Sequence, residues 1–510
     1  MVTNSQIAQM LSQTADLLEI KGENPFKVRA YRNAARIVEN SSKDFNKLVK
    51  EGFDLTRLSG IGKDLSANIK EIVTTGKFSK LEELKKEVPQ GLVDMLSIEG
   101  LGPKRIKQIY EAFHITSLDE LKKYAENGEL EKLSGFGAKL IEKILKGVKQ
   151  LKKAGIRFLW AEVEKIAEDL KNYLLKFPGV EIVEIAGSYR RKKESVGDLD
   201  ILVVAKDYPK VSEYFIKYPK VKEIHSAGLT RSTVFLENDL QVDLRAVSKD
   251  SYGAALHYFT GSKAHNIEIR KLAIEKGMKV NEYGVYKDNK KIAGASEEEV
   301  YKAVGLCFIE PELRENRGEI QACLENKLPN LVKLEEIKGD LNISSDLIDE
   351  AIKKGYKYIG VKNSLIKRDD IKIFSVLEQN IKAINPQKNY DFLVGIVDKD
   401  ASNEMVLEAI KKVDFLRFFR DIKNNIEPQI DYDLIFKEMA KNNVKLEVIS
   451  RPNNLIRDTL IKKAIETGVK ISIVSNANKK EELGFIKYGI NQARRGWAES
   501  KDVINTQNLT

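Results

Sequence analysis

The chain has 510 residues, enough for about three or four domains, and its hydrophobic content of 42% allows each to form a core. Its formal net charge of +10 favours an acidic partner such as nucleic acid, although a lysine-rich solvated surface would give the same balance. No apolar run reaches about 18 residues, so the sequence predicts no membrane-spanning helix and no membrane partner.

The two cysteines, Cys307 and Cys323, lie in unlike sequence contexts and cannot build a disulfide framework or a zinc cluster. Their scarcity fits a reducing compartment, and we expect a cytoplasmic protein. The first 20 residues have the apolar spacing of an amphipathic helix and not the pattern of a signal peptide.

Three glycine-containing turns repeat along the first 150 residues: "LSGIGKDLSANI", "IEGLGPKRIKQI" and "LSGFGAKLIEKI". In each, Gly-x-Gly precedes a segment of helical spacing, whose first N–H groups and dipole can hold a phosphate without reading base sequence. We therefore predict helix–hairpin–helix contacts with DNA, with simple helix packing as the alternative. The residues predicted to contact DNA here are Gly60, Gly62, Lys63, Gly100, Gly102, Lys104, Gly135, Gly137 and Lys139.

From about residue 155 the composition becomes α/β. The helical segment "WAEVEKIAEDLKNYLLKF" leads to the strand "VEIVEIAG", and the further strands "VKEIHSAG", "RSTVFLEN" and "LQVDLRAV" follow. Between them lies "AGSYRRKKESVGDLDILVV", and after them "SYGAALHYFTGSKAHNIEIRKLAIEKG" returns to helix.

Asp198 and Asp200 are one residue apart at the start of a β-branched run, so their side chains project from the same face of a strand. Two bare carboxylates at this range repel each other unless cations lie between them. A pair of Mg²⁺ ions would remove the conflict and would suit phosphoryl transfer, with Asp243 as the third carboxylate. The alternative is a solvated turn before the strand.

Just upstream, Gly187 and Ser188 provide N–H and hydroxyl donors, and Arg190 and Arg191 provide guanidinium groups. Such donors beside a metal cage are what a triphosphate requires. Beyond residue 325, "ENKLPNLVKLEEIKGD" is typical of a linker, and short apolar strands then alternate with helices, which indicates parallel β/α units.

Four stretches resemble family X DNA polymerases, the group of DNA polymerase beta. "GSYRRKKESVGDLDILV" is similar to their nucleotidyltransferase signature, and "YFTGSKAHNIEIR" is a second match. "PELRENRGEI" and "YGINQARRGW" resemble bacterial and archaeal members that carry a C-terminal PHP (polymerase and histidinol phosphatase) domain. The resemblance covers nearly the whole chain.

The resemblance implies a multidomain α and α/β protein with helix–hairpin–helix N-terminal domains, a nucleotidyltransferase palm with a thumb, and a degenerate PHP-like β/α barrel. The expected boundaries are 1–85 for a lyase-like domain, 86–154 for a helix–hairpin–helix domain, 155–247 for the palm, 248–325 for the thumb, 326–336 for a linker and 337–510 for the barrel.

The resemblance also implies roles for single residues. Asp198, Asp200 and Asp243 would be the catalytic carboxylates that bind two Mg²⁺ ions, with Mn²⁺ as a possible substitute. The nucleotide would be contacted by Gly187, Ser188, Arg191, Gly197, Tyr258, Phe259, Gly261, Asn266 and Arg270. Without the resemblance, Tyr258 and Phe259 would be interpreted as helix-end packing, and His265 is expected to be a contact residue and not a metal ligand.

The N-terminal "PFKVRAYRNAARIV" resembles the lyase domain of the family, in which Lys27, Tyr31 and Arg32 would bind a DNA phosphate. Lyase chemistry needs a lysine amine, but Asn68 stands where that lysine is expected. Lys63 and Lys70 are nearby, either as weak substitutes or as solvated helix lysines, so lyase activity is doubtful.

The PHP family holds its metals with His-x-His, Asp-His and Asp-x-His elements, whereas this chain has Asn342 and Ser344, Asn363 and Ser364, and Asn476 and Asn478 at those positions. All four histidines, His114, His225, His257 and His265, precede residue 266. A histidine-based metal cluster is therefore impossible in residues 330–510, and we expect a scaffold that has lost its nuclease.

These features together predict a monomeric, template-directed DNA polymerase that uses deoxynucleoside triphosphates to fill short gaps in DNA repair. Two alternatives remain at this point. One is a template-independent nucleotidyltransferase, and the other is a non-catalytic scaffold that binds DNA ends.

Overall fold

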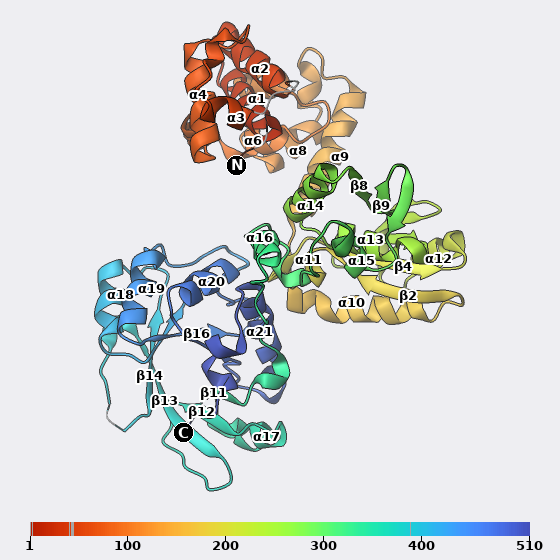
Figure 1. Cartoon of the computed structure of the whole chain (residues 1–510). Coiled ribbons are helices and arrows are strands. Elements are labelled where there is room, and N and C mark those ends of the chain that lie inside the picture. The colour runs from red at the N-terminus through yellow and green to blue at the C-terminus, as the bar shows by residue number, and fades with distance from the viewer. Residues whose placement is uncertain (1, 3, 40, 42–44, 388, 510) are drawn as a thin grey trace. The chain divides into compact units, whose positions relative to one another are not determined.

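A computed structural model describes residues 2, 4–39, 41, 45–387 and 389–509. The chain divides into two compact units, Met1–Ile156 and Arg157–Thr510 (Figure 1). None of the described helices is both long and apolar enough to cross a lipid bilayer.

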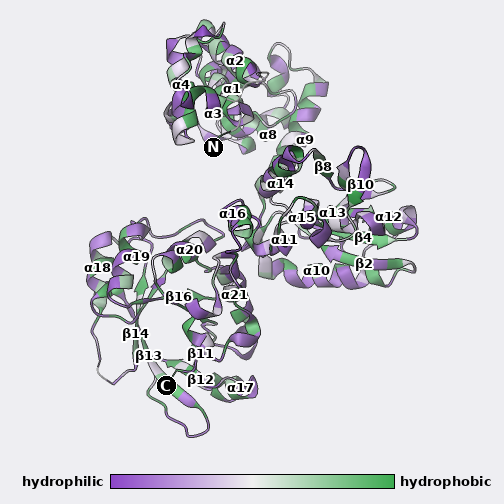
Figure 2. Ribbon diagram, viewed as in Figure 1, coloured by the Kyte–Doolittle hydropathy of each residue, from purple (hydrophilic) through white to green (hydrophobic). Residues whose placement is uncertain are grey.

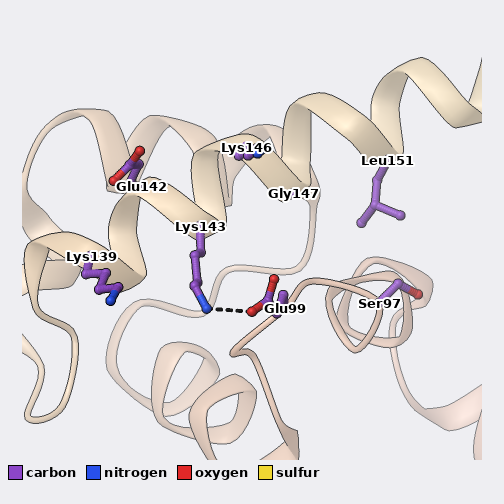
Figure 3. A pocket seen from close by; sticks show the side chains of 8 residues that line it. All are labelled: Ser97, Glu99, Lys139, Glu142, Lys143, Lys146, Gly147 and Leu151. Carbon is purple, nitrogen blue, oxygen red and sulfur yellow. Dashed lines mark hydrogen bonds and ion pairs between the residues drawn. The ribbon is translucent and has the colours of Figure 1, made fainter. Parts of the chain in front are cut away.

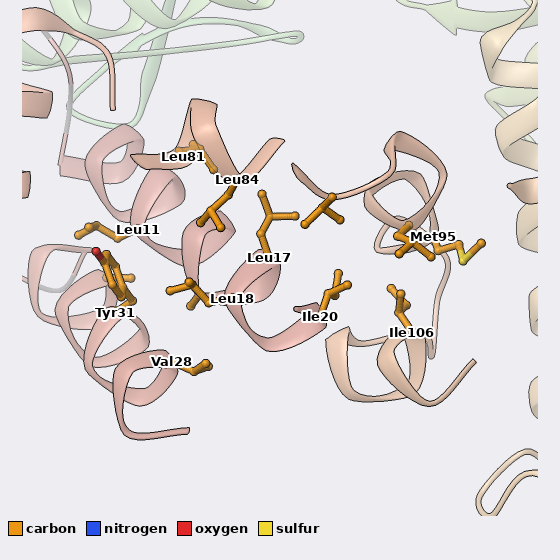
Figure 4. Close-up of a cluster of buried hydrophobic side chains, with 14 of the residues drawn as sticks. Leu11, Leu17, Leu18, Ile20, Val28, Tyr31, Leu81, Leu84, Met95 and Ile106 are labelled. Atoms are coloured by element: carbon orange, nitrogen blue, oxygen red, sulfur yellow. The ribbon is translucent and has the colours of Figure 1, made fainter. Parts of the chain in front are cut away.

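The N-terminal unit is helical. Its helices are α1 (Asn4–Ile20), α2 (Pro25–Glu39), α3 (Phe45–Lys50), α4 (Lys63–Thr75), α5 (Ser79–Glu87), α6 (Gln90–Met95), α7 (Pro103–Phe113), α8 (Leu118–Glu126) and α9 (Ala138–Gly155). Along α1, Ile7, Leu11 and Leu18 recur at helical spacing and are fully buried. Figure 4 shows part of the apolar core that they join, and in Figure 2 hydrophobic and hydrophilic residues alternate along these ribbons.

The three Gly-x-Gly turns have one common geometry. Gly60, Gly100 and Gly135 adopt the left-handed φ values of 92°, 92° and 84°, which other residues rarely adopt. The helices α4, α7 and α9 begin directly after these turns, as the sequence repeat predicts. Gly62 and Gly102 precede α4 and α7 and provide no side-chain cap for the first N–H groups of those helices.

The C-terminal unit begins with the region in which the palm is expected, and we use that name for it. Its sheet has the strand order β2-β4-β7-β6-β5 among the described residues. The strands are β2 (Val180–Ile185), β4 (Asp198–Ala205), β5 (Val221–Ala227), β6 (Arg231–Leu236) and β7 (Gln241–Val247), and β1 (Phe158–Leu159) pairs separately with β3 (Ser195–Val196). Strands β4 and β7 are parallel neighbours, and the other neighbouring pairs of the five-stranded sheet are antiparallel.

Two helices, α10 (Trp160–Leu175) and α12 (Tyr208–Phe215), share a core with one face of this sheet. Leu199, Ile201 and Val203 of β4 belong to that core. Because side chains alternate along a strand, Asp198, Asp200 and Leu202 face the other side. Leu202 there packs against Ala255 and Leu256 of α13 (Tyr252–Thr260).

The thumb continues with α14 (Lys263–Glu275), so the helical stretch predicted from the sequence is two helices separated at Gly261, whose φ is 68°. A small antiparallel sheet follows, made of β8 (Met278–Asn281), β9 (Gly284–Lys287) and β10 (Lys290–Ala293). Helices α15 (Glu297–Ala303) and α16 (Glu319–Leu324) complete the region. Cys307 and Cys323 are bonded to each other with an S–S distance of 2.11 Å, whereas the sequence favoured reduced cysteines.

The last region is a nearly closed parallel barrel. Its strands follow the chain order: β11 (Gly339–Ile343), β12 (Tyr358–Lys362), β13 (Lys372–Asn380), β14 (Phe392–Val397), β15 (Phe415–Phe418), β16 (Lys445–Ile449) and β17 (Ile471–Val474). The outer helices are α17 (Ile348–Lys353), α18 (Asn403–Ile410), α19 (Tyr432–Lys441), α20 (Asp458–Glu466) and α21 (Ile486–Arg495). A parallel bridge between Ile343 and Ala477 brings the first and last strands together, which confirms the predicted β/α barrel.

Candidate active site

The three aspartates singled out from the sequence converge on one face of the palm sheet. In the parallel pair of β4 and β7, Asp200 lies directly opposite Asp243, and Asp198 precedes Asp200 on the same face. One carboxylate oxygen from each of the three residues lies within 4.8 Å of the others. Among the described residues, no other group of three potential metal ligands comes this close.

Two neighbouring side chains orient the Asp243 carboxylate. The Thr233 hydroxyl on β6 donates a hydrogen bond to Oδ1, and Gln241 Nε2 donates one to Oδ2 at 2.7 Å. Sequence reasoning missed both residues. Gln241 lies two positions before Asp243 on β7, so the alternation of side chains along a strand could have placed both on one face. Thr233 lies on β6, and its position opposite Asp243 depends on the register of the two strands, which the sequence does not show.

The cluster concentrates negative charge in a partly buried place. Burial raises the pKa of Asp200 to about 7, and the carboxylates of Asp198 and Asp243 add to the rise. Burial also raises the pKa of Asp198, with Asp243 as the second cause. Three converging carboxylates are a donor set that fits a hard divalent cation, which would relieve this repulsion.

The chain approaches this cluster closely at Gly187, the first residue of the short helix α11 (Gly187–Arg190). Its φ is 61°, and a Cβ atom added there would lie 2.3 Å from Oδ2 of Asp200. Only glycine therefore lets the turn lie against the carboxylate. The N–H of Ala186 also donates to the Asp200 carbonyl at 2.7 Å, which fixes the turn to β4.

A pocket of about 440 Å³ opens beside the carboxylates. It is lined by Gly187, Ser188, Arg191, Asp198, Asp200, Tyr258, Phe259, Gly261, Lys263, Asn266, Ile267 and Arg270. The lining brings together every residue predicted to contact the nucleotide except Gly197. It adds Lys263 and Ile267, which sequence reasoning missed. Lys263 lies in the stretch "GSKAHN", two residues after Gly261. Its positive charge in this stretch was the one feature of the sequence that could have marked it as a phosphate contact.

The two adjacent arginines differ in their surroundings. Arg191 lines the pocket, where its Nη1 donates to the Thr260 carbonyl at 2.5 Å and its Nε donates to Glu315 Oε1 at 3.0 Å. Arg190 instead forms two hydrogen bonds with the buried Glu297, at 2.9 and 2.6 Å. Arg191 therefore reaches the pocket while Thr260 and Glu315 hold it in place, whereas Arg190 joins the palm to the thumb.

The thumb wall of the pocket is built around α13 and α14. The Arg270 guanidinium lies 5.2 Å from the centre of the Tyr258 ring, and Asn266 Nδ2 donates to the Tyr258 carbonyl at 2.7 Å. Asn266 Oδ1 is buried and has no hydrogen-bond partner, so it can accept one from a ligand. His265 is fully buried between Glu319 and Tyr301 and does not line the pocket, so its role as a contact residue stays a prediction.

In the N-terminal unit, the residues predicted to contact DNA lie in several places. One hollow of about 880 Å³ is lined by Arg32, Lys104 and Gly135, together with Arg29, Arg105 and Lys107. A second hollow, of about 480 Å³, is lined by Lys139 and two further lysines of α9, Lys143 and Lys146 (Figure 3). Acidic side chains also line these hollows, Glu19, Glu23 and Glu111 in the first and Glu99 and Glu142 in the second, and the small excess of basic residues suits a phosphate backbone.

The remaining N-terminal candidates form no single hollow. Lys27 is exposed, with its amine 3.4 Å from Glu23, and Lys63 is exposed at the start of α4. Tyr31 is buried, and its hydroxyl oxygen accepts a hydrogen bond from Asn68 Nδ2 at 2.9 Å. Asn68, which stands where the resemblance places the lyase lysine, is thus held as an amide donor.

The carboxyl end of the barrel carries the residues that replace the expected metal ligands. Asn342 Nδ2 donates to Glu378 at 2.7 Å and to Glu447 at 3.0 Å. The buried Arg417 donates to Glu447 at 2.5 Å and also to Glu378. One guanidinium group is therefore shared by these two carboxylates and offsets one of their two negative charges.

The other replaced positions lie at the ends of β12 and β17. Asn363 Oδ1 accepts from the Glu378 N–H at 3.0 Å, and Asn476 Oδ1 accepts from Lys362 at 3.0 Å. The backbone N–H of Asn478 donates to Glu482 at 2.8 Å. Ser344, by contrast, donates its backbone N–H to the Ala477 carbonyl at 2.9 Å across the barrel closure, and Ser364 follows Asn363 directly.

Family models match most of the chain. The DNA polymerase beta palm matches residues 157–271, and the DNA polymerase beta thumb matches residues 255–315. A helix-hairpin-helix domain matches residues 2–78, and a SAM-like helix-hairpin-helix tandem matches residues 92–150.

Curated relatives agree with these matches. The chain is 33% identical to "DNA polymerase/3'-5' exonuclease PolX" of Bacillus subtilis, over 99% of this chain and 97% of that protein. It is 27% identical to DNA polymerase lambda of Arabidopsis thaliana, over 61% of this chain and 62% of the relative. DNA polymerase lambda of Rattus norvegicus is 26% identical, over 61% of this chain and 56% of the relative.

Proposed function

The chain belongs to the family X DNA polymerases and is a DNA-directed DNA polymerase that fills short gaps in repair, and we propose that Asp198, Asp200 and Asp243 form its catalytic metal site. The observation that carries this proposal is the register of β4 and β7, which sets the three carboxylates beside the pocket. Divalent metals are the family's cofactor. That the metal is a pair of Mg²⁺ ions, with Mn²⁺ as a substitute, is part of the proposal.

The reaction joins the primer 3′-oxygen to the α-phosphorus of a deoxynucleoside triphosphate and releases pyrophosphate. When bound, the metal supplies a Lewis acid that offsets the negative charge developing on the phosphoryl oxygens. Asp198, Asp200 and Asp243 would hold it. Thr233 and Gln241 keep the Asp243 carboxylate turned toward the cluster.

The remaining pocket residues would bind the nucleotide. Arg191 and the donors of Gly187 and Ser188 would hold the triphosphate, because guanidinium and N–H groups match phosphate oxygens. We retain Gly197 in this group as a prediction from the family motif. On the thumb side, Tyr258, Phe259 and Gly261 would lie beside the sugar, Asn266 beside the base, and Arg270 toward the template strand. Lys263 joins the proposed phosphate contacts, since it lines the same pocket.

The N-terminal unit would hold the DNA without reading its sequence. The proposed contacts are Lys27, Tyr31, Arg32, Gly60, Gly62, Lys63, Gly100, Gly102, Lys104, Gly135, Gly137 and Lys139. Their support is the shared turn geometry and the two basic hollows.

We further propose that the barrel has lost its nuclease, that lyase activity is lacking or weak, and that the protein acts as a monomer in the cytoplasm, where its DNA and nucleotides are found. The proposed domain boundaries remain at 85/86, 154/155, 247/248, 325/326 and 336/337. The intervals between the family matches, at residues 79–91 and 151–156, include the first two of these boundaries.

The test is gap filling on a one-nucleotide gap, with each nucleotide offered alone and with or without a 5′-phosphate at the gap. The expected result is insertion of the complementary nucleotide, improved by the 5′-phosphate. Equal addition of all four nucleotides would favour a template-independent transferase. Tight DNA binding without any incorporation would favour an end-binding scaffold.

A further inference from the structure

A buried arginine of the barrel lies next to the nucleotide pocket of the palm. Arg495, the last residue of α21, is only 2% exposed. Its Nη1 donates to the carbonyl of Arg191 at 2.7 Å and to Glu315 Oε1 at 3.1 Å, and its Nη2 donates to Asp458 Oδ2 at 2.6 Å. One guanidinium thus joins the barrel to two neighbours of the pocket.

Glu315 is the shared partner in this arrangement. The same oxygen that accepts from Arg495 also accepts from Arg191 Nε at 3.0 Å. Burial would raise the pKa of the Glu315 carboxyl, but the charges of Arg191 and Arg495 together hold that pKa below its usual value. Arg191 and Arg495 therefore share Glu315 as a hydrogen-bond acceptor.

The charges of the cluster explain why the second arginine matters. Arg317 also pairs with Asp458 at 2.9 Å, so among the paired groups three cations (Arg191, Arg317, Arg495) face two anions (Glu315, Asp458). Lys193 and Glu194 lie near enough to add one charge of each sign, so one positive charge remains. If Arg495 were removed, Arg191 would be the one arginine among the described residues still paired with Glu315. The Arg191 guanidinium would then be neutralised by its own neighbour and would attract a triphosphate less.

We propose that Arg495 is a positioning residue for nucleotide binding: it engages Glu315 and the Arg191 carbonyl so that the Arg191 guanidinium stays available to the triphosphate. This inference rests on the proposed nucleotide site. It gives the barrel a part in polymerisation that does not depend on any metal site of its own.

The contact lies within an interface that combines apolar packing with several other ion pairs, among them Lys487–Glu164 and Arg494–Glu312, so Arg495 makes only one of many contacts there. The Tyr488 ring lies 5.8 Å from that of Trp160, and Leu455 and Tyr488 belong to the palm core. Arg420 offers a matched control: it is buried in the same interface and donates to Glu194 at 2.8 Å, but its hydrogen-bond and ion-pair partners among the described residues include neither Arg191 nor Glu315, and it lies outside the pocket lining.

The experiment measures single-nucleotide incorporation on gapped DNA by the full chain and by the variants Arg495→Met, Arg495→Lys and Arg420→Met. We expect Arg495→Met to raise the KM for the nucleotide about tenfold, the effect of one charge-assisted hydrogen bond, with an unchanged Kd for gapped DNA. Arg495→Lys should recover part of the loss, because an ammonium still offsets Glu315. Arg420→Met should stay within about twofold of the wild type.

A double variant tests the charge argument directly and remains informative if Arg495→Met folds poorly. In Arg495→Met/Glu315→Gln the competing carboxylate is gone, so the KM should fall back toward the wild-type value. An unchanged KM in Arg495→Met, or an equal rise in Arg420→Met, would overturn the inference, as would the lack of any recovery in the double variant.

Arg191→Ala separates this inference from the proposed function. If Arg191→Ala leaves the nucleotide KM unchanged, the proposed nucleotide site is wrong, and the inference fails with it. If Arg191→Ala raises the KM and Arg495→Met does not, only the role of Arg495 is wrong.

Discussion

Asp200 and Asp243 are direct partners across the parallel strands β4 and β7, and both carboxylates point away from the face covered by α10 and α12. Since β7 is the strand next to β4 in the sheet, the third carboxylate reaches the first two from a position 43 residues later in the chain, counted from Asp200 to Asp243. The clustering of the three carboxylates therefore depends on the pairing of β4 with β7 and not on a single loop.

Asp243→Ala should abolish nucleotide incorporation, by about a thousandfold or more, because a ligand of the proposed catalytic metal is lost. Binding of gapped DNA should change by less than about twofold, since the N-terminal unit supplies the proposed contacts to the DNA backbone. Steady-state incorporation and fluorescence titration of gapped DNA measure the two quantities. Asp169→Ala, which removes an exposed ion pair with Lys220, is the control, and incorporation by Asp243→Ala at the wild-type rate would refute the assignment.

Thr233→Val should raise the metal concentration needed for half-maximal incorporation about tenfold, because valine keeps the shape of threonine but cannot donate to Asp243. Saturating metal should restore most of the activity, which it should not do for Asp243→Ala. The matched control is Ser232→Ala on the same strand, whose buried hydroxyl contacts Ser212 instead. An equal metal requirement in Thr233→Val and the wild type would contradict the role of Thr233.

The carboxylate cluster was predictable from the sequence because it depends on a local period. Asp198 and Asp200 share a face through the two-residue alternation of a strand, and Asp243 lies in a short apolar run of its own. The parallel β/α units were predictable from the alternation of strands with helices, although β12, β13 and β14 follow one another without an α-helix, whereas closure into a barrel was implied by the family resemblance. By contrast, β8, β9 and β10 have four residues each, which is too short for a clear pattern, and they were missed.

The surroundings of Arg191 could not be predicted in the same way. Glu315 lies 124 residues from Arg191, and Arg495 lies 304 residues from it. No local spacing relates these positions, because Glu315 meets Arg191 through the packing of the thumb region, and Arg495 meets it through the packing of the barrel. Both residues lie in stretches that resemble the family. That resemblance marked the stretches as important but did not predict which residues would be in contact.

Borohydride treatment of the protein on an incised abasic site should trap little or no covalent adduct. A Schiff base needs a lysine amine, whereas Asn68 presents an amide that is already engaged with Tyr31. Electrophoresis of the protein with labelled DNA detects the adduct. Asn68→Lys, which supplies an amine at this place, is the positive comparison. An adduct in the wild type that disappears with Lys63→Ala or Lys70→Ala would show that a neighbouring lysine performs the lyase reaction.

The protein should show no Mn²⁺-dependent 3′–5′ exonuclease activity. A metal at the carboxyl end of the barrel would have to displace the Arg417 guanidinium, which is buried and bonded to Glu378 and Glu447. The assay follows digestion of labelled single-stranded DNA by Asp198→Ala, in which the polymerase is inactivated. Robust digestion that survives Asp198→Ala but is lost in Glu447→Gln would show that the barrel retains a nuclease.

The stability of the barrel should depend on the ionisation of Asp340. This carboxyl is fully buried on β11 and receives N–H groups from Asn342 and Ser475 at 3.2 Å, yet burial raises its pKa to about 7. A pKa raised by folding means that the folded state binds the extra proton. The stabilisation is therefore complete below the unfolded-state pKa of about 4 and is lost as the pH rises through about 7.

Asp340→Asn removes this titration and should become more favourable relative to the wild type as the pH rises from 5 to 8. The difference should grow by up to about 1.4 kcal/mol per pH unit below pH 7, the free energy linked to one proton. Urea unfolding followed by a probe on the barrel, at pH 5 and at pH 8, measures it, with the exposed Asp346→Asn as the matched control. A difference between Asp340→Asn and the wild type that is equal at both pH values would mean that Asp340 does not bind a proton on folding in this range.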